Sequence, residues 1–265
     1  KRERFSEEWK FAVKDSADEL DVSIIIAAHN AGEYITEAVS SSMQTSGVTF
    51  EVIVVDDASG DDTAQRLRKL STKFVTLRVL NQETNQGAFV SRNIGIQASR
   101  AKFISFLDSD DVQDQNRLAK QIKALQTSSS GIVSYCQSRR WTEDWANPLT
   151  SSNLCFISSV FPKALIQEVG FFDSVRWGGD AEFRSRIVAN FGHEAVIDLE
   201  ECLYRARYRE GSLTSSGQSK MLHLDSGKLR VQLPQARHDY RRNFAKWHRS
   251  GAQLQISFPL TSRPF

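Results

Sequence analysis

Residues 103–112 read FISFLDSDDV, a run of apolar side chains that ends in three carboxylates. Near-continuous apolar residues over this length predict a strand that is buried on both faces. Asp108, Asp110 and Asp111 lie so close together that their charges repel one another. A turn tolerates such repulsion where water screens it or where a cation neutralises it. The stretch therefore raises a choice between a solvated acidic turn and a cation site at a strand end.

The sequence around this stretch alternates between strand and helix patterns. We predict strands over 22–28, 51–57, 74–80 and 102–108, and helices over 31–43, 61–70, 87–99 and 115–125. This alternation indicates an α/β fold with a Rossmann-like, mostly parallel sheet flanked by helices. Ligands of such sheets bind outside the carboxyl ends of the strands. Acidic residues end two of these strands, at Asp56–Asp57 and Asp108–Asp111, which favours a ligand site over a solvated turn.

The chain divides into three predicted regions. Residues 1–20 form an amphipathic helix, residues 21–215 the main domain, and residues 216–265 a basic C-terminal extension. The second half of the main domain is less regular. There we predict strands over 131–140, 153–161, 194–199 and 202–208, and helices over 162–170, with Pro162 in the first turn, and over 178–192.

Composition narrows the classes of protein that the chain can represent. With 265 residues, 40% of them hydrophobic, it can bury one large core. A net charge of +2 from 34 basic and 32 acidic residues argues against general nucleic-acid binding. The three cysteines form no metal-spaced pair and suit a reducing, cytoplasmic compartment. We find no secretory signal and no apolar run of about 18 residues, so we expect no membrane-spanning helix.

Five stretches of the chain share a pattern with one enzyme family. They read VSIIIAAHNAGEYITEAVSS (22–41), EVIVVDDASGDDT (51–63), NQGAFVSRNIGIQAS (85–99), KFISFLDSDD (102–111) and WGGDAEF (177–183). In this order the chain resembles the family 2 glycosyltransferases, which have the GT-A fold, over roughly residues 21–215. The resemblance implies an inverting hexosyl- or N-acetylhexosaminyltransferase that uses a nucleotide-diphosphate sugar. The main domain is then expected to be a GT-A domain.

The resemblance assigns nucleotide contacts to the loops that follow the strands. It places Asp57 on the base, which is usually uracil, and Asp108 on the ribose side. It places backbone groups and the first turn around the rest of the nucleotide. The residues involved are Ala27, Ala28, Asn30, Asn85, Gly87 and Arg92. Family members usually carry Tyr where this chain has His29, and an imidazole can still stack or hydrogen-bond.

A divalent cation is the expected cofactor. Hard oxygen ligands suit Mg²⁺ or Mn²⁺, and Mg²⁺ takes only one or two protein carboxylates beside phosphate oxygens. The resemblance implies that Asp110 holds the cation against the diphosphate. His223 is a further candidate ligand, although a lone histidine is more often a surface residue. In the segment 204–217, Arg209, Ser212 and Thr214 are candidate diphosphate contacts, and a solvated basic strand is the alternative.

Asp180 is the expected general base. It stands at the start of a predicted helix, where the helix dipole stabilises a carboxylate. As a base it takes the proton from the acceptor hydroxyl, and as a purely structural residue it caps the helix. Glu182 is the reserve base or an acceptor contact. Trp177 is either a sugar-stacking face or a core residue.

The segment 235–249 predicts a basic amphipathic helix with Tyr240, Phe244 and Trp247 on one side. It lies either on an anionic membrane surface, near a lipid-linked acceptor, or with its aromatic side against the catalytic domain or a neighbouring domain. We therefore expect a cytoplasmic protein that could associate with the inner face of the cell membrane.

The expected function is transfer of a sugar, from a UDP-sugar in the first instance, to a glycan or glycolipid acceptor in surface polysaccharide biosynthesis. One alternative is a sugar nucleotidyltransferase, which needs a Gly-rich basic loop where this chain reads AHNAGEY (28–34). Another is a non-catalytic GT-A domain that binds nucleotide-sugar or glycan. An NAD-binding enzyme would need G-x-G-x-x-G after the first strand, and this pattern is absent.

Overall fold

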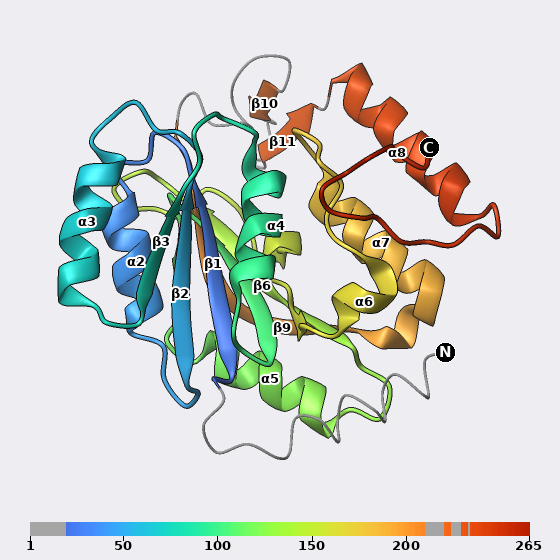
Figure 1. The fold of residues 1–265 in the computed structure, drawn as a ribbon, viewed down its shortest axis with the longest axis horizontal. Coiled ribbons are helices and arrows are strands. Elements are labelled where there is room, and N and C mark those ends of the chain that lie inside the picture. Colours follow the sequence, from blue (N-terminus) through green and yellow to red (C-terminus); the bar gives the residue numbers. More distant parts are fainter. Residues whose placement is uncertain (1–19, 210–219, 224–228, 233) are drawn as a thin grey trace.

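The computed structural model describes residues 20–209, 220–223, 229–232 and 234–265, and for 220–223 and 229–232 only the backbone. Within these residues a nine-stranded mixed sheet runs through the molecule, with helices on both sides (Figure 1). The N-terminal helix predicted over residues 1–20 lies outside the described residues except for Leu20.

Four parallel strands form the first half of the sheet, in the order β3-β2-β1-β4. They are β1 (Val22–Ala28), β2 (Phe50–Asp56), β3 (Leu77–Asn81) and β4 (Phe103–Asp108). The register sets Ala28 opposite Asp56 and Ala27 opposite Asp108. The loops after β1, β2 and β4 therefore leave the sheet at one edge. This arrangement confirms the predicted parallel α/β half.

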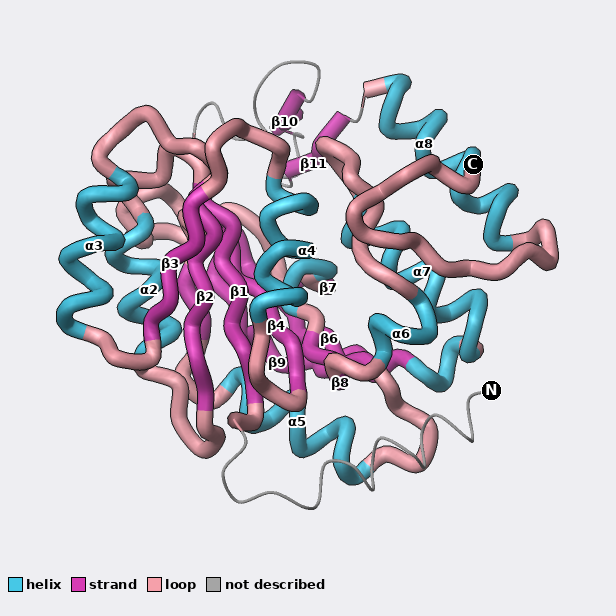
Figure 2. Tube along the Cα trace, in the orientation of Figure 1, coloured by secondary structure: helices cyan, strands magenta, loops and turns pink. Residues whose placement is uncertain are grey.

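Helices cover both faces of this parallel half. Figures 1 and 2 show α2 (Ile35–Met43) and α3 (Thr63–Lys73) on one side and α4 (Ala88–Ala98) on the other. Gly95 allows α4 to lie close to the sheet, because a Cβ there would come within 2.4 Å of the Ile25 side chain. The helix α5 (Arg117–Thr127) follows β4.

The second half of the sheet is antiparallel where it meets the first. It comprises β5 (Val112–Gln113), β6 (Val133–Trp141), β7 (Asn153–Leu154), β8 (Val160–Pro162) and β9 (Val196–Arg207). β8 pairs antiparallel with β4, and β9 runs parallel to β6 and pairs antiparallel with β5.

The structure corrects three details of the predicted second half. The strand predicted over 153–161 is broken by a 3₁₀ turn at Phe156–Ser158, where the Ser158 hydroxyl hydrogen-bonds to backbone carbonyls. Pro162 ends β8, so the short helix α6 starts later, at Leu165–Val169. The two strands predicted over 194–199 and 202–208 form one continuous strand, because β9 pairs with β6 along most of its length.

The C-terminal part of the chain packs beside α7 (Gly179–Phe191). β10 (Lys220–His223) and β11 (Leu229–Gln232) form a hairpin, and α8 spans Gln235–His248. Residues 250–265 then return to the main domain, where the Phe171 amide donates to the Ile256 carbonyl at 2.8 Å. Across the described ranges, no helix combines the length and apolar character needed to cross a bilayer.

Candidate functional site

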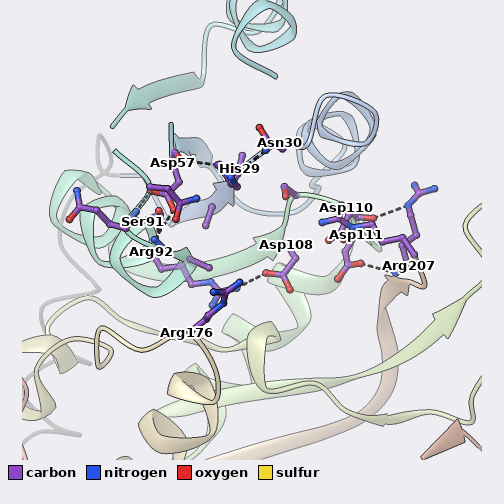
Figure 3. Close-up of a pocket in the computed structure, with 18 of the residues that line it drawn as sticks. His29, Asn30, Asp57, Ser91, Arg92, Asp108, Asp110, Asp111, Arg176 and Arg207 are labelled. Carbon is purple, nitrogen blue, oxygen red and sulfur yellow. Dashed lines mark hydrogen bonds and ion pairs between the residues drawn. The ribbon is translucent and has the colours of Figure 1, made fainter. Parts of the chain in front are cut away.

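A cavity of about 680 Å³ opens at the edge where β1, β2 and β4 end (Figure 3). The end of β9 and the loop before α7 complete its wall. Most of the residues predicted to bind nucleotide, cation or diphosphate line it together. They are Ala27, Ala28, Asn30, Asp57, Asn85, Gly87, Arg92, Asp108, Asp110 and Arg209.

The turn after β1 is tied to the turn after β2. Asn30 adopts a left-handed backbone (φ 48°), which Asn tolerates better than most residues. Its side-chain oxygen accepts a hydrogen bond from the Gly60 amide at 2.8 Å. Nδ1 of His29 lies 2.8 Å from the carbonyl oxygen of Asp57. The two loops therefore form one wall of the cavity.

Asp57 fixes the loop that precedes α4. Its side chain is buried, with 2% of the residue exposed. Oδ1 accepts hydrogen bonds from the Gln82 side chain and the Gln86 amide, both at 2.8 Å, and Oδ2 accepts one from the Gly87 amide at 2.7 Å. Gly87 has a positive φ of 94°, a conformation that favours glycine. The carboxylate expected to contact the base thus also shapes the loop beside it.

Arg92 and Asp108 form an ion pair across the floor of the cavity. Nη2 of Arg92 lies 2.6 Å from Oδ1 of Asp108 (Figure 3). The Arg92 guanidinium also lies over the Phe89 ring, 4.8 Å from its centroid. The Asp108 side chain remains 37% exposed, so it keeps acceptor sites toward the cavity that a ribose hydroxyl could use.

The Asp108–Asp111 turn concentrates negative charge, as the sequence predicted. Burial and the nearby Asp108 raise the pKa of Asp110, although the Arg209 guanidinium at 2.6 Å opposes the shift. Asp111 is more deeply buried, and burial together with its two acidic neighbours raises its pKa well above the usual range. Oδ1 of Asp111 accepts a hydrogen bond from the Arg207 amide at 2.7 Å. Arginines at the end of β9 therefore supply the compensating charge and hydrogen bonds.

Arg207 supports this turn through a hydrogen bond and is itself enclosed by residues distant in sequence. These residues are Tyr34, Glu37, Glu143 and Trp145, which we call the cage. Nε of Arg207 donates to the Asp110 carbonyl at 2.9 Å, and its other nitrogens contact the Glu143 carbonyl and the Glu37 carboxylate. The guanidinium lies 4.1 Å from the Trp145 ring centroid and 5.0 Å from that of Tyr34. The sequence indicated a basic segment here but gave no sign of these contacts. The members of the cage come from the start of α2 and from the loop after β6, and no spacing pattern links those regions to residue 207.

The acidic turn fits a divalent cation by its chemistry. Asp108 and Asp110 offer carboxylate oxygens, the donors that Mg²⁺ and Mn²⁺ prefer. Among the described side chains, no group of three or more His, Cys, Asp or Glu residues could enclose a metal ion. A cation here would therefore be shared with phosphate oxygens. The side chain of His223 lies outside the described part of the chain, as do Ser212 and Thr214.

Asp180 lies in the first turn of α7, beyond the residues that line the cavity. Gly178, with a left-handed φ of 76°, occupies the N-cap position. Oδ1 of Asp180 accepts a hydrogen bond from the Ala181 amide at 2.9 Å, so both the base role and a structural role at the helix start remain predictions. The start of α7 packs on α4 close to the cavity, since a Cβ on Gly179 would come within 3.0 Å of the Phe89 ring. Arg237, on α8, interacts electrostatically with the Asp180 carboxylate. Burial lowers the pKa of this guanidinium, and the Asp180 charge opposes that shift.

Glu182 lies in a buried, ion-paired environment that favours a structural role, and its reserve role as a base remains a prediction. It is fully buried, and its oxygens accept hydrogen bonds from Nε and Nη2 of Arg186 at 2.9 and 2.8 Å. Nε2 of His248 lies 3.0 Å from the same carboxylate. Burial alone would raise its pKa, but these partners outweigh burial and hold the pKa below its ordinary value. Trp177 is half-buried, with the Arg176 guanidinium 5.5 Å from its ring centroid, and does not line the cavity.

The cavity also contains residues that sequence reasoning did not assign. Ser109 and Asp111 belong to the acidic turn itself, and Arg176 directly precedes the WGGDAEF stretch, so their neighbours in sequence could have drawn attention to them. Arg140 comes from the end of β6, for which no sequence signal was available. These additions make the cavity wall rich in both carboxylates and guanidinium groups.

Two curated relatives are similar in sequence to this chain over part of their length. The chain is 37% identical over 113 residues to the succinoglycan biosynthesis protein ExoO of Rhizobium meliloti (strain 1021), covering 43% of this chain and 32% of that protein. It is 34% identical over 108 residues to the Escherichia coli UDP-Glc:alpha-D-GlcNAc-diphosphoundecaprenol beta-1,3-glucosyltransferase WfgD, covering 41% and 42%. The chain thus spans less than half the length of these relatives.

Solved structures show the fold, and a family model shows the family. Staphylococcus aureus TarS 1–349 in complex with UDP-GlcNAc superposes with a TM-score of 0.61 at 23% identity, over 75% of this chain and 61% of that one. The mannosyltransferase PcManGT of Pyrobaculum calidifontis, in complex with GDP-Man and Mn²⁺, gives 0.59 at 16% identity, over 79% and 64%. The family model described as glycosyl transferase family 2 matches residues 23–191. The chain therefore belongs to glycosyl transferase family 2, and its sheet has the GT-A fold.

Proposed function

We propose that this protein is an inverting glycosyltransferase that moves a sugar from a nucleotide-diphosphate sugar, with UDP as the nucleotide, to a hydroxyl of a glycan or lipid-linked acceptor. One observation supports this most directly. The cavity gathers Asp57, Asp108 and Asp110 at a single sheet edge, together with arginines that suit phosphate groups. This combination matches the three parts of a nucleotide-diphosphate ligand, namely base, ribose and diphosphate.

On the donor side, different residues bind the base, the ribose and the diphosphate. Asp57 and the loop up to Gly87 bind the base, and Asp108 accepts hydrogen bonds from the ribose. Asp110 is the carboxylate that would hold Mn²⁺ or Mg²⁺, whose charge stabilises the departing diphosphate. Arg209 neutralises further phosphate charge from the end of β9, 2.6 Å from Asp110 in the present arrangement.

On the acceptor side, Asp180 acts as the general base. It takes the proton from the acceptor hydroxyl while that oxygen forms a bond to the anomeric carbon. The bond between the anomeric carbon and the diphosphate breaks in the same displacement, so the configuration inverts. The start of α7 suits this role, because the helix dipole stabilises the ionised carboxylate and the Phe89 contact keeps it beside the donor cavity.

The named complexes and relatives support the substrate classes. TarS was solved with UDP-GlcNAc, PcManGT with GDP-Man and Mn²⁺, and the relative WfgD is named for a UDP-glucose donor and a diphosphoundecaprenol acceptor. By analogy we propose a UDP-sugar donor, a divalent cation and a lipid-linked acceptor in surface polysaccharide biosynthesis. Work on such an acceptor would place the protein at the inner face of the cell membrane.

A donor screen tests this proposal. The protein is incubated with UDP-, GDP-, CMP- and dTDP-sugars and Mn²⁺, and released nucleotide is measured with the Asp180→Asn variant as the control. We expect release from a UDP-sugar by the wild-type protein and much less by the variant. Tight UDP binding without release under any acceptor would support the non-catalytic alternative. Absence of binding to every donor would overturn the proposal.

A further inference from the structure

The helix α8 turns its aromatic side toward the protein. Phe244 and Trp247 are buried, and the Tyr240 and Phe244 rings lie 5.3 Å apart. At the end of the helix, His248 reaches the buried Glu182 carboxylate of α7. The apolar side chains of α8 are therefore engaged in packing within the chain, and they are not available for insertion into a lipid layer.

The opposite side of α8 and its C-cap residue carry four exposed cations. Arg241, Arg242, Lys246 and Arg249 are all exposed, and their spacing puts them on one side of a helix with 3.6 residues per turn. We call these four residues the basic face. Asp239 is the one acidic residue of α8, and it forms an ion pair with Arg242 at 2.6 Å.

The helix that carries the basic face is a direct neighbour of the helix that carries Asp180. α8 packs along α7, the helix that carries Asp180, and a Cβ at Gly178 would come within 3.7 Å of the Tyr240 ring. Figure 1 shows α8 at the outer edge of the molecule, away from α3 on the far side of the sheet. A surface bound by α8 would therefore lie closer to Asp180 than to the outer side of the parallel half-sheet.

We propose that the basic face of α8 binds anionic phospholipid headgroups and holds the enzyme at the membrane. The occupant follows from charge complementarity, and from the lipid-linked acceptor of the proposed function, on which this inference rests. Basic residues near an anionic surface each add attraction that falls off within a Debye length. Because the aromatic side chains face inward, the binding is electrostatic and sensitive to salt.

Vesicle sedimentation tests the inference on the purified chain. The variant Arg241→Glu/Arg242→Glu/Lys246→Glu/Arg249→Glu reverses the basic face. The matched control reverses four exposed cations of α3, namely Arg66→Glu/Arg68→Glu/Lys69→Glu/Lys73→Glu, with the same change in net charge. Vesicles are made of phosphatidylcholine alone or mixed with phosphatidylglycerol, at low and at high salt.

We expect the wild-type protein and the α3 variant to bind only the vesicles that contain phosphatidylglycerol, and only at low salt. The α8 variant should bind them at least tenfold more weakly, on the order of the loss of several surface cations. Equal weakening in both variants would show a net-charge effect and overturn the inference, as would unchanged binding of the α8 variant or equal binding to neutral vesicles. A labelled oligonucleotide that binds the basic face more tightly than the anionic vesicles do would assign the face to nucleic acid instead.

The vesicle assay and the nucleotide-release assay can fail separately, so a failure of membrane binding is distinguishable from a failure of the proposed transfer activity. Calorimetric UDP affinity in the α8 variant reports whether the donor cavity remains folded, because none of the four substituted residues lines it. Vesicle binding without nucleotide release from any donor would leave the membrane surface in place and remove only the proposed transfer activity. Donor turnover without vesicle binding would support the transfer activity and overturn the membrane-binding role of the basic face.

Discussion

Nε of Arg209 lies 2.6 Å from Oδ2 of Asp110, so the carboxylate expected to hold a cation already has a cationic neighbour from the end of β9. A carboxylate offers about four lone-pair sites on two oxygens, so it can keep an arginine on one oxygen and meet a metal ion with the other. The same arginine then faces the phosphate groups that share the metal. Asp110 and Arg209 therefore act as one unit in donor binding, and the predictions below treat the acidic turn in that way.

Replacing Asp110 with Asn should abolish the metal-dependent part of UDP affinity. The amide keeps the size of the side chain but loses the charge that a divalent cation needs. Calorimetry of UDP with and without Mn²⁺ measures the difference. The control is Asp62→Asn, an exposed substitution at the N-cap of α3 that does not line the cavity. An Asp110→Asn protein in which Mn²⁺ still strengthens UDP binding would exclude Asp110 as the cation ligand.

Replacing Asp57 with Ala should weaken UDP binding equally with and without Mn²⁺. The change removes the expected base contact and three hydrogen bonds that hold the loop from Gln82 to Gly87. Gln82→Leu removes one of these bonds and keeps the carboxylate, so it separates loop shape from base contact. If the loss in Asp57→Ala appears only when Mn²⁺ is present, the residue acts on the diphosphate end and our assignment is wrong.

Replacing Asp180 with Asn should leave UDP affinity intact and lower sugar transfer by about 10²–10⁴-fold, the usual contribution of a general base. Asp180 lies outside the residues that line the donor cavity, so binding and turnover are expected to separate. Paired calorimetry and nucleotide-release assays measure both, with Asp198→Asn, at a surface pair with Arg184, as the control. Full turnover in Asp180→Asn would show that another group accepts the proton.

Replacing Arg207 with Gln should weaken Mn²⁺-dependent UDP binding by roughly 10-fold or more, in the range seen when residues behind metal ligands are removed. Arg207 supports the acidic turn through the Asp110 carbonyl and occupies the aromatic cage of Trp145 and Tyr34. Arg205→Gln is a close control, because Arg205 lies on the same strand and stacks on Trp141 outside the cavity. Equal effects of the two substitutions would mean that the overall positive charge of this strand strengthens UDP binding, and that the Arg207 contact with the Asp110 carbonyl has no specific role.

Replacing Glu182 with Gln should reduce the acid sensitivity of the fold. The partners of Glu182 lower its pKa in the folded state, so the ionised carboxylate stabilises the fold above its ordinary pKa of about 4.5. This contribution is lost as pH falls through the lowered pKa. The wild-type free energy of unfolding should therefore drop more steeply on acidification than that of the variant.

The same substitution should cost about 3–5 kcal/mol near pH 7, because Arg186 would remain buried without its counter-charge. Urea unfolding from pH 7 down to about pH 3 measures both effects, because the loss falls below the ordinary pKa of the carboxylate. Glu168→Gln, on the neighbouring helix α6, provides the comparison. Parallel pH curves for the wild-type and Glu182→Gln proteins would show that this carboxylate is not a source of the acid sensitivity.

The parallel half of the fold was predictable because its signals are local. The strand β4 is a short apolar run, and its acidic end marks the sheet edge where ligands bind. The donor residues follow such strands directly, so the prediction of one cavity for Asp57, Asp108 and Asp110 is confirmed in its placement. Their individual contacts with a nucleotide remain predictions.

The features that the sequence did not reveal depend on contacts between distant residues. Glu182 and Asp180 look equivalent in WGGDAEF, and only the helix geometry turns Glu182 inward to Arg186, one turn along α7. The cage around Arg207 joins Glu37, Glu143 and Trp145, which no local pattern connects. The inward orientation of the α8 aromatic residues likewise depends on the surface that α7 offers. Burial, rather than residue type, decided each of these roles.

Much of the cavity wall comes from loops beyond the carboxyl ends of β1, β2 and β4, whereas the core side chains of these strands lie within the sheet. The loop part of the cavity can therefore change over evolution without repacking the core. Substitutions at exposed positions such as Asn85 and Arg176 can alter the specificity for the donor sugar at little cost in stability. Asp57 and Asp111 are different, since both are buried and also organise backbone around them. In a descendant of this protein that acquires a new substrate, these two acids should be among the last of the cavity residues to be replaced.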